Sequence, residues 1–117
     1  MMFRQLSRKS DGVILAEKAF FAVTWFDRFR GMIGRKFISA PFDAMVFERC
    51  NAVHCCWMSE AIDVLFITPE LEVIKVCHSV KPWRLVWANK SSADTVELPA
   101  GTLKHHAVKA GDHLEWK

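Results

Sequence analysis

The side chains best suited to chemistry lie close together in the middle of the chain, between residues 50 and 63. Side chains alternate faces along a strand, so His54, Cys56 and Met58 would share one face of an extended segment. An imidazole, a thiol and a thioether are soft ligands that suit Cu(I) or Zn. However, successive positions on one strand face are about 7 Å apart, which is awkward for one ion. We therefore expect no metal and no other cofactor, and keep His54, Cys56 and Cys77 as weak candidate ligands.

Asp63 is a second candidate because it lies within the apolar run 62–67. A carboxylate there costs free energy unless it is paired or hydrogen-bonded. One interpretation is that Asp63 anchors a loop by accepting backbone N–H groups. The other is that it lines a small pocket with His54, in which case the pair could act as acid and base in a small hydrolase or lyase. An enzyme of that kind also needs a nucleophile and an oxyanion hole, and no serine lies in a Gly-x-Ser-x-Gly setting.

Trp83 and Arg84 follow a proline and offer a ring and a guanidinium that could stack on a ligand. With no complete catalytic set, we predict a small non-catalytic binding or accessory module rather than an enzyme. Its partner would be a small ligand or another protein. The ligand-binding candidates are His54, Met58, Asp63, Trp83 and Arg84. The alternatives are the small hydrolase or lyase and a soft-metal binding protein.

Length and composition limit the remaining possibilities. The chain has 117 residues, 51% of them apolar and 25% charged, which predicts one globular domain over residues 1–117. A net charge of +3 with scattered lysines and arginines disfavours nucleic-acid binding. The four cysteines form no Cys-x-x-Cys pair, and we find neither a secretory leader nor an apolar run of membrane-spanning length. We therefore expect a cytoplasmic protein with reduced thiols.

Short apolar segments with frequent turn signals must position these residues. We predict eight or nine short strands, among them 13–16, 19–23, 44–47, 53–58, 62–67 and 72–80. A turn at residues 68–71 would join the last two as a hairpin. The clearest helix spans residues 24–33, with Thr24 as its N-cap. Its buried stripe would consist of Trp25, Phe29 and either Met32 or Ile33. The fold class is mainly β, a compact antiparallel sandwich or barrel-like domain with one or two short helices.

Five motifs then fall into one order along residues 22–116. The first is Arg-Phe-Arg-Gly-Met-Ile-Gly-Arg at 28–35, and the central one runs from Cys50 to Phe66 through His54 and Asp63. The remaining three are Pro-Trp-Arg at 82–84, Glu-Leu-Pro-Ala-Gly at 97–101 and Gly-Asp at 111–112. With these motifs the chain resembles the prokaryotic family known as domain of unknown function 192.

The resemblance implies a bacterial protein with a compact, mainly β fold and short helices. It implies no established reaction. The chain departs from the family pattern at Cys55, where a threonine is usual, and at Thr68, where an acidic residue is usual. A hydroxyl role after His54 is therefore not expected in this chain. Cys50 falls on a motif position, so we expect it to belong to the family's central segment.

Overall fold

A computed structural model describes residues 2–33, 35–54 and 59–117 of the chain. Nine strands and two short helices lie within these residues. They are β1 (Phe3–Arg8), β2 (Ile14–Phe21), α1 (Trp25–Arg30), β3 (Ala44–Phe47), β4 (Ala52–His54), β5 (Ile62–Ile67), β6 (Val73–Val80), β7 (Leu85–Trp87), β8 (Asp94–Pro99), α2 (Thr102–His105) and β9 (Leu114–Trp116). The prediction of a mainly β fold is confirmed.

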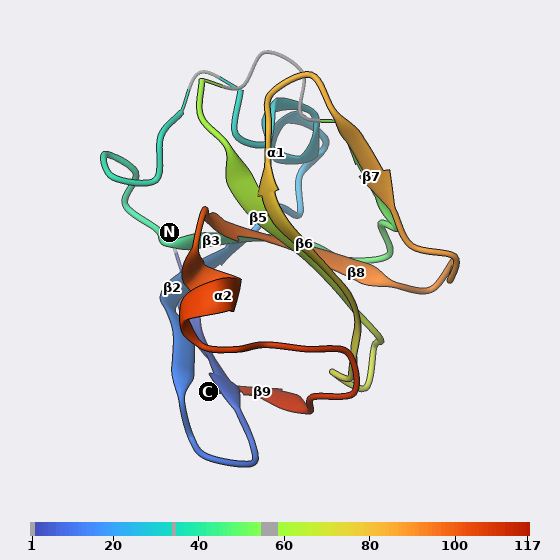
Figure 1. Cartoon of the computed structure of the whole chain (residues 1–117). Helices are drawn as coiled ribbons and strands as arrows, with labels where there is room; N and C mark the ends of the chain where they lie inside the picture. Colours follow the sequence, from blue (N-terminus) through green and yellow to red (C-terminus); the bar gives the residue numbers. More distant parts are fainter. Residues whose placement is uncertain (1, 34, 55–58) are drawn as a thin grey trace.

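The large sheet has seven strands in the order β6-β5-β8-β3-β2-β1-β9 and curls into a half-barrel (Figure 1). Its neighbouring strands are antiparallel except for β2 and β3, which pair in parallel. Strands β4 and β7 form a separate two-stranded sheet. Strand β5 lies between β6 and β8, and all six of its residues are buried, so it is the central core strand that the apolar run 62–67 predicted.

The two faces of the large sheet carry separate cores, because side chains alternate along each strand. Leu65 packs in one core with Leu103 of α2, and we call this face the α2 side. Val64 packs in the other core with Met32, which follows α1 in the chain, and we call this face the α1 side. Figure 1 shows the two helices on opposite sides of the central strands. Consecutive residues of one strand therefore reach two different environments.

The first strand was not predicted from the sequence. The strands expected at 13–16 and 19–23 are a single strand, β2, and β1 precedes it in the polar segment 3–8. That segment carries only two apolar residues, Phe3 and Leu6, so the alternation that marks a strand is weak. Backbone pairing with β2 on one side and β9 on the other stabilises it instead.

Helix α1 is shorter than the predicted span of 24–33. Thr24 is the N-cap as predicted, and its hydroxyl accepts a hydrogen bond from the Asp27 amide at 3.1 Å. The helix ends at Gly31, whose φ of 49° and ψ of −126° turn the chain away from the helix axis. Phe29, predicted as buried, is 68% exposed, and the buried side chain is Met32, placed by the turn after Gly31. The prediction was wrong for Phe29 because the helix ends before the turn that it assumed, and it is confirmed for Met32, which is buried.

The central hairpin agrees with the prediction. The Leu71 amide donates to the Thr68 carbonyl oxygen at 2.8 Å and closes the turn between β5 and β6. The strand predicted over 53–58 is described only as far as His54, and its remainder lies outside the described residues. Neither described helix has the length or the hydropathy needed to cross a lipid bilayer.

Candidate ligand-binding pocket

Asp63 is fully buried on the α2 side of the sheet, and both of its carboxylate oxygens are occupied. Oδ1 accepts a hydrogen bond from the Ser79 amide at 2.8 Å, and Oδ2 accepts one from the Leu103 amide at 2.9 Å. Gly101, the N-cap of α2, has no side chain to cap the helix, so Asp63 satisfies a helix N–H group that would otherwise lack a partner. This geometry matches the anchoring interpretation of Asp63.

Two other predicted site residues, Trp83 and Arg84, directly precede β7 of the small sheet. The backbone of His54 at the end of β4 pairs with Leu85 of β7, which places it beside the segment that contains Trp83 and Arg84. Trp83 is 61% exposed and has a positive φ of 71°, and Arg84 is exposed. Met58 and the side chain of His54 lie outside the described part of the structure. Only the His54 backbone and the Trp83–Arg84 segment are therefore brought together, while Asp63 faces α2.

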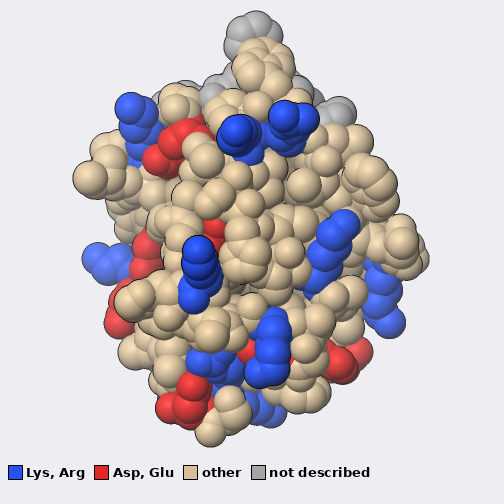
Figure 2. All heavy atoms as spheres, in the orientation of Figure 1, with Lys and Arg blue, Asp and Glu red and all other residues tan. Residues whose placement is uncertain are grey.

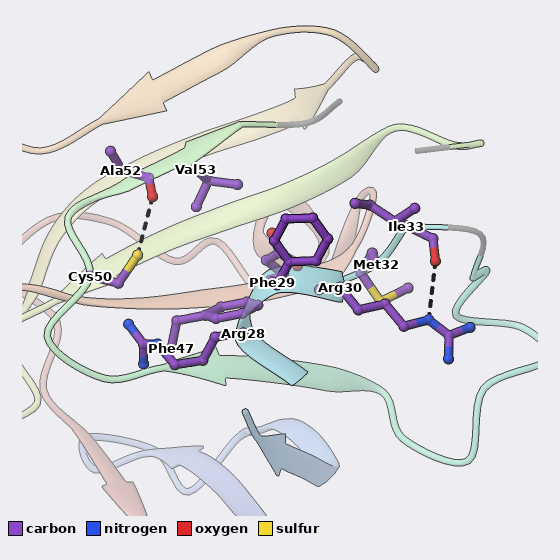
Figure 3. Close-up of a pocket in the computed structure, with 11 residues that line it drawn as sticks. Arg28, Phe29, Arg30, Met32, Ile33, Phe47, Cys50, Ala52 and Val53 are labelled. Atoms are coloured by element: carbon purple, nitrogen blue, oxygen red, sulfur yellow. Dashed lines mark hydrogen bonds between the residues drawn. The ribbon is translucent and has the colours of Figure 1, made fainter. Parts of the chain in front are cut away.

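A cavity of about 200 Å³ opens on the α1 side of the sheet (Figure 3). Several elements that are distant in sequence form its walls: α1 and the turn after it, the end of β3, the segment leading into β4, and β8. Its lining residues are Arg28, Phe29, Arg30, Gly31, Met32, Ile33, Phe47, Cys50, Ala52, Val53 and Glu97. Three of the five sequence motifs thus meet at this one pocket.

The segment before β4 is held against the sheet by its backbone. The Cys50 amide donates to the Ala93 carbonyl oxygen at 2.9 Å, and its own carbonyl oxygen accepts from the Thr95 hydroxyl at 2.5 Å. Thr95 and Glu97 alternate with Val96 along β8 and so lie on the same face of that strand. These bonds place Cys50 and Ala52 over the sheet face from which Glu97 projects.

Glycine is required where α1 meets the pocket. Gly31 donates its N–H to the Asp27 carbonyl oxygen at 2.9 Å while adopting a positive φ that side chains with a Cβ rarely tolerate. A Cβ at this position would lie 3.5 Å from Cζ of Phe47, an ordinary van der Waals contact, so the requirement for glycine comes from the positive φ. Gly31 therefore lets the chain turn next to β3 and directs Met32 into the core beneath the pocket.

Glu97 is the exceptional group of the pocket. It is 3% exposed, and its Oε1 has no hydrogen-bond partner among the described residues. Its strand neighbours on β3 and β5 are Met45 and Val64, which offer no side-chain donor. Burial raises the pKa of Glu97 from 4.5 to about 8 because desolvation disfavours the charged form. At neutral pH this carboxyl group is therefore mostly protonated.

Two arginines from α1 flank the pocket. Arg28 donates from Nη1 to the Glu48 carbonyl oxygen at 3.0 Å, and Arg30 donates from Nε to the Ile33 carbonyl oxygen at 3.4 Å. Figure 3 shows their guanidinium groups on either side of Phe29. Neither forms an ion pair within the described residues. A guanidinium has five N–H donors, so both retain donors for another acceptor.

The cysteines give no sign of a metal centre within the described residues. Cys50 directs its sulfur to the Ala52 carbonyl oxygen at 3.1 Å (Figure 3). Cys77 is partly buried on β6, and burial raises the pKa of its thiol, against the weaker opposing effect of Lys75. No group of three or more potential ligands occurs in the described part of the chain. Cys56 lies outside it, so the soft-metal alternative stays a prediction.

Sequence reasoning identified the segments of this pocket but not its key residues. Arg28, Arg30, Cys50 and Glu97 were recognised only as members of motifs. The available signal was Glu97, a charged residue between Val96 and Leu98 in the predicted strand 95–98. A buried carboxylate there would need a partner, as Asp63 does in strand 62–67. The sequence alone does not indicate which of the two carboxylates finds hydrogen-bond donors.

Fold and pocket together define a single mainly β domain with a small cavity beneath its first helix. The chain belongs to the DUF192 family (Uncharacterized ACR, COG1430), whose model matches residues 6–116. It is 36% identical over 102 residues to a UPF0127 protein of Pyrococcus furiosus, covering 82% of this chain and 84% of the relative. It is 28% identical over 118 residues to a UPF0127 protein of Thermococcus sibiricus, covering 96% and 74%. The family predicted from the motifs is confirmed, and it has no established function.

Two crystal structures share the fold. A proposed transcription regulator from Sinorhizobium meliloti superimposes with a TM-score of 0.80 at 25% identity, covering 97% of this chain and 91% of that one. A protein of unknown function from Novosphingobium aromaticivorans gives a TM-score of 0.76 at 17% identity, covering 97% and 84%. The half-barrel with its two short helices is therefore a fold found in experimental structures.

Proposed function

We propose that the protein is a small non-catalytic binding module and that the pocket beneath α1 holds its ligand. One observation carries the proposal: Oε1 of Glu97 is buried at the pocket and has no hydrogen-bond partner in the part of the chain that the structure describes. An unsatisfied buried polar atom costs about 1–3 kcal/mol, and such a cost is typical of functional sites. A ligand that hydrogen-bonds to Glu97 would remove it.

The hydrogen bonds and the protonation of the polar groups favour binding over catalysis. A hydrolase or lyase based on His54 and Asp63 needs a free carboxylate, whereas both oxygens of Asp63 accept backbone N–H groups. In the pocket, the thiol of Cys50 is directed at a backbone carbonyl, and Glu97 is mostly protonated at neutral pH. The predicted contacts of His54, Met58, Trp83 and Arg84 with a ligand stay a proposal.

Nucleic acid is a less favoured ligand. The structure from Sinorhizobium meliloti is that of a proposed transcription regulator, which raises the question of whether this chain binds nucleic acid. On the face drawn in Figure 2, however, blue Lys and Arg groups are interspersed with red Asp and Glu groups rather than gathered in one strip. A duplex-binding surface normally concentrates its positive charge on one face.

A fragment screen followed by amide NMR shifts tests the proposal. We expect bound fragments to shift the amides of Gly31, Met32 and Ala52, and to lose this effect in Ala52→Trp, which places a ring over the pocket from an exposed position. Ala110→Trp, at an exposed position outside the pocket lining, should bind like the wild type. Fragments that shift other regions only, or bind equally to Ala52→Trp, would contradict the proposal.

A further inference from the structure

The ligand class of this pocket can be inferred from its charges, its walls and its size. We propose that the pocket binds a compact organic carboxylate, with its anionic end at the arginines of α1 and an inner hydroxyl or carbonyl group at Glu97. This inference rests on the proposed function and adds to it the chemistry of the ligand. Three features of the described residues support it.

The first feature is the uncompensated positive charge beside the pocket. Arg28 and Arg30 line it and form no ion pair within the described part of the chain. Arg35 is close enough to Arg30 that this like charge adds to burial in lowering the pKa of Arg35, and Asp27 opposes the effect only as the smallest cause. Guanidinium groups pair strongly with planar carboxylates, so an organic anion would relieve this repulsion.

The second feature is the neutral polar group of the pocket. Oε1 of Glu97 is buried without a hydrogen-bond partner among the described residues, and burial raises the pKa of this carboxyl group. A protonated carboxyl both donates and accepts hydrogen bonds, and an uncharged hydroxyl or carbonyl group satisfies it. The charged end of the ligand belongs at the arginines and the neutral end at Glu97.

The third feature is the apolar wall between these two ends. Met32 and Val53 are buried there, and Phe47 forms the wall on β3. The volume of about 200 Å³ is smaller than the roughly 300–1,000 Å³ of pockets for drug-sized ligands. A single ring or a short branched chain therefore fits, and inorganic phosphate would leave the apolar wall without contacts.

Three matched probes separate charge from shape: 4-hydroxybenzoate, its neutral amide and 4-hydroxybenzylamine. At pH 6.5 we expect the carboxylate to bind about tenfold more tightly than either of the others, as measured by NMR titration of the pocket amides. Arg28→Gln and Arg30→Gln should each weaken 4-hydroxybenzoate by about threefold to tenfold. Lys104→Gln, which removes an exposed charge from α2 on the other side of the sheet, should leave its affinity within about twofold of the wild type.

Benzoate, which lacks the inner hydroxyl group, tests the contact with Glu97. We expect the wild type to prefer 4-hydroxybenzoate over benzoate by about fivefold, and Glu97→Met to abolish this preference while retaining benzoate binding. A preference that survives in Glu97→Met would overturn the inner contact.

Two outcomes separate this inference from the proposed function. If the amide or the amine shifts the pocket residues as strongly as the carboxylate, the pocket binds ligands but the anion inference is wrong. The same conclusion follows if Lys104→Gln weakens 4-hydroxybenzoate as much as Arg28→Gln does. If neither these probes nor any fragment of the screen shifts the pocket residues, the proposed function fails as well.

Discussion

Two buried carboxyl groups on neighbouring strands have opposite surroundings. Asp63 on β5 faces the α2 side, is fully buried and accepts a backbone N–H at each oxygen. Glu97 on β8 faces the α1 side, is 3% exposed and has an Oε1 without a partner in the described structure. Their burial is nearly equal, so burial alone does not separate a structural acid from a ligand-binding one. The difference lies in the hydrogen-bond donors that each face supplies.

The largest effect is expected from removing the satisfied carboxylate. Asp63→Ala leaves the amide of Ser79 and the buried amide of Leu103 without acceptors, and should lower the free energy of unfolding by about 3–5 kcal/mol. Urea denaturation measures this loss. Asp63→Asn keeps one oxygen acceptor and should lose clearly less stability. Equal stability of Asp63→Ala and the wild type would show that Asp63 does not anchor α2.

The second effect is a dependence of stability on pH that comes from Glu97. The pKa of Glu97 is about 8 in the folded protein against an ordinary value of 4.5, so between these values the folded state holds a proton that the unfolded state has released. The free energy of unfolding should therefore fall as pH rises through this window, by at most about 1.4 kcal/mol per unit.

Glu97→Gln has no titrating group at this position and serves as the control for that measurement. The stability of the wild type relative to Glu97→Gln should decline from pH 4.5 to about 8 and then level off. A difference between the two proteins that does not change with pH would argue against a protonated Glu97.

Removing the unsatisfied carboxyl should have a smaller effect of the opposite sign. Glu97→Met replaces it with an apolar chain of similar length between Met45 and Val64, and should raise the free energy of unfolding at pH 7 by about 1 kcal/mol. Thermal or urea unfolding measures the gain. A loss comparable to that of Asp63→Ala would mean that Glu97 also has a structural role.

The smallest effect is expected at the cap of α1. Thr24→Ala removes the acceptor for the Asp27 amide and should lower the free energy of unfolding by about 0.5–1 kcal/mol. Because α1 carries Arg28 and Arg30, the same variant should weaken fragment binding to the pocket. Thr24→Ser keeps the hydroxyl and should retain both the stability and the fragment binding of the wild type. Unchanged binding in Thr24→Ala would show that the N-cap of α1 does not influence the pocket.

Strong apolar patterns predicted the fold well, and weak ones did not. Strand β5 agrees with its predicted span of 62–67 because every residue except Asp63 is apolar. Strand β1 was missed because only Phe3 and Leu6 mark it, and its stability depends on pairing with strands distant in sequence. The end of α1 was missed because the chain already turns at Gly31 with a positive φ, before the predicted end at residue 33.

The site was harder to predict for a similar reason. The sequence reveals that Asp63 lies in an apolar strand and that Glu97 lies between Val96 and Leu98, but not which backbone amides face them. The amides that satisfy Asp63 come from Ser79 and Leu103, which are 16 and 40 residues away in the chain. The motifs around Arg28 and Cys50 likewise meet only after the sheet has curled and α1 has packed against it.

The most direct test of this comparison is the pKa of Glu97 itself. The chemical shift of its side-chain carboxyl carbon, followed by NMR from pH 3 to 10 and assigned by its absence in Glu97→Gln, reports the titration. We expect a midpoint near 8, because Glu97 is buried and its Oε1 has no hydrogen-bond partner among the described residues. A midpoint near the ordinary 4.5 would show that Glu97 is ionised and paired like Asp63, and would contradict a neutral carboxyl that awaits a ligand.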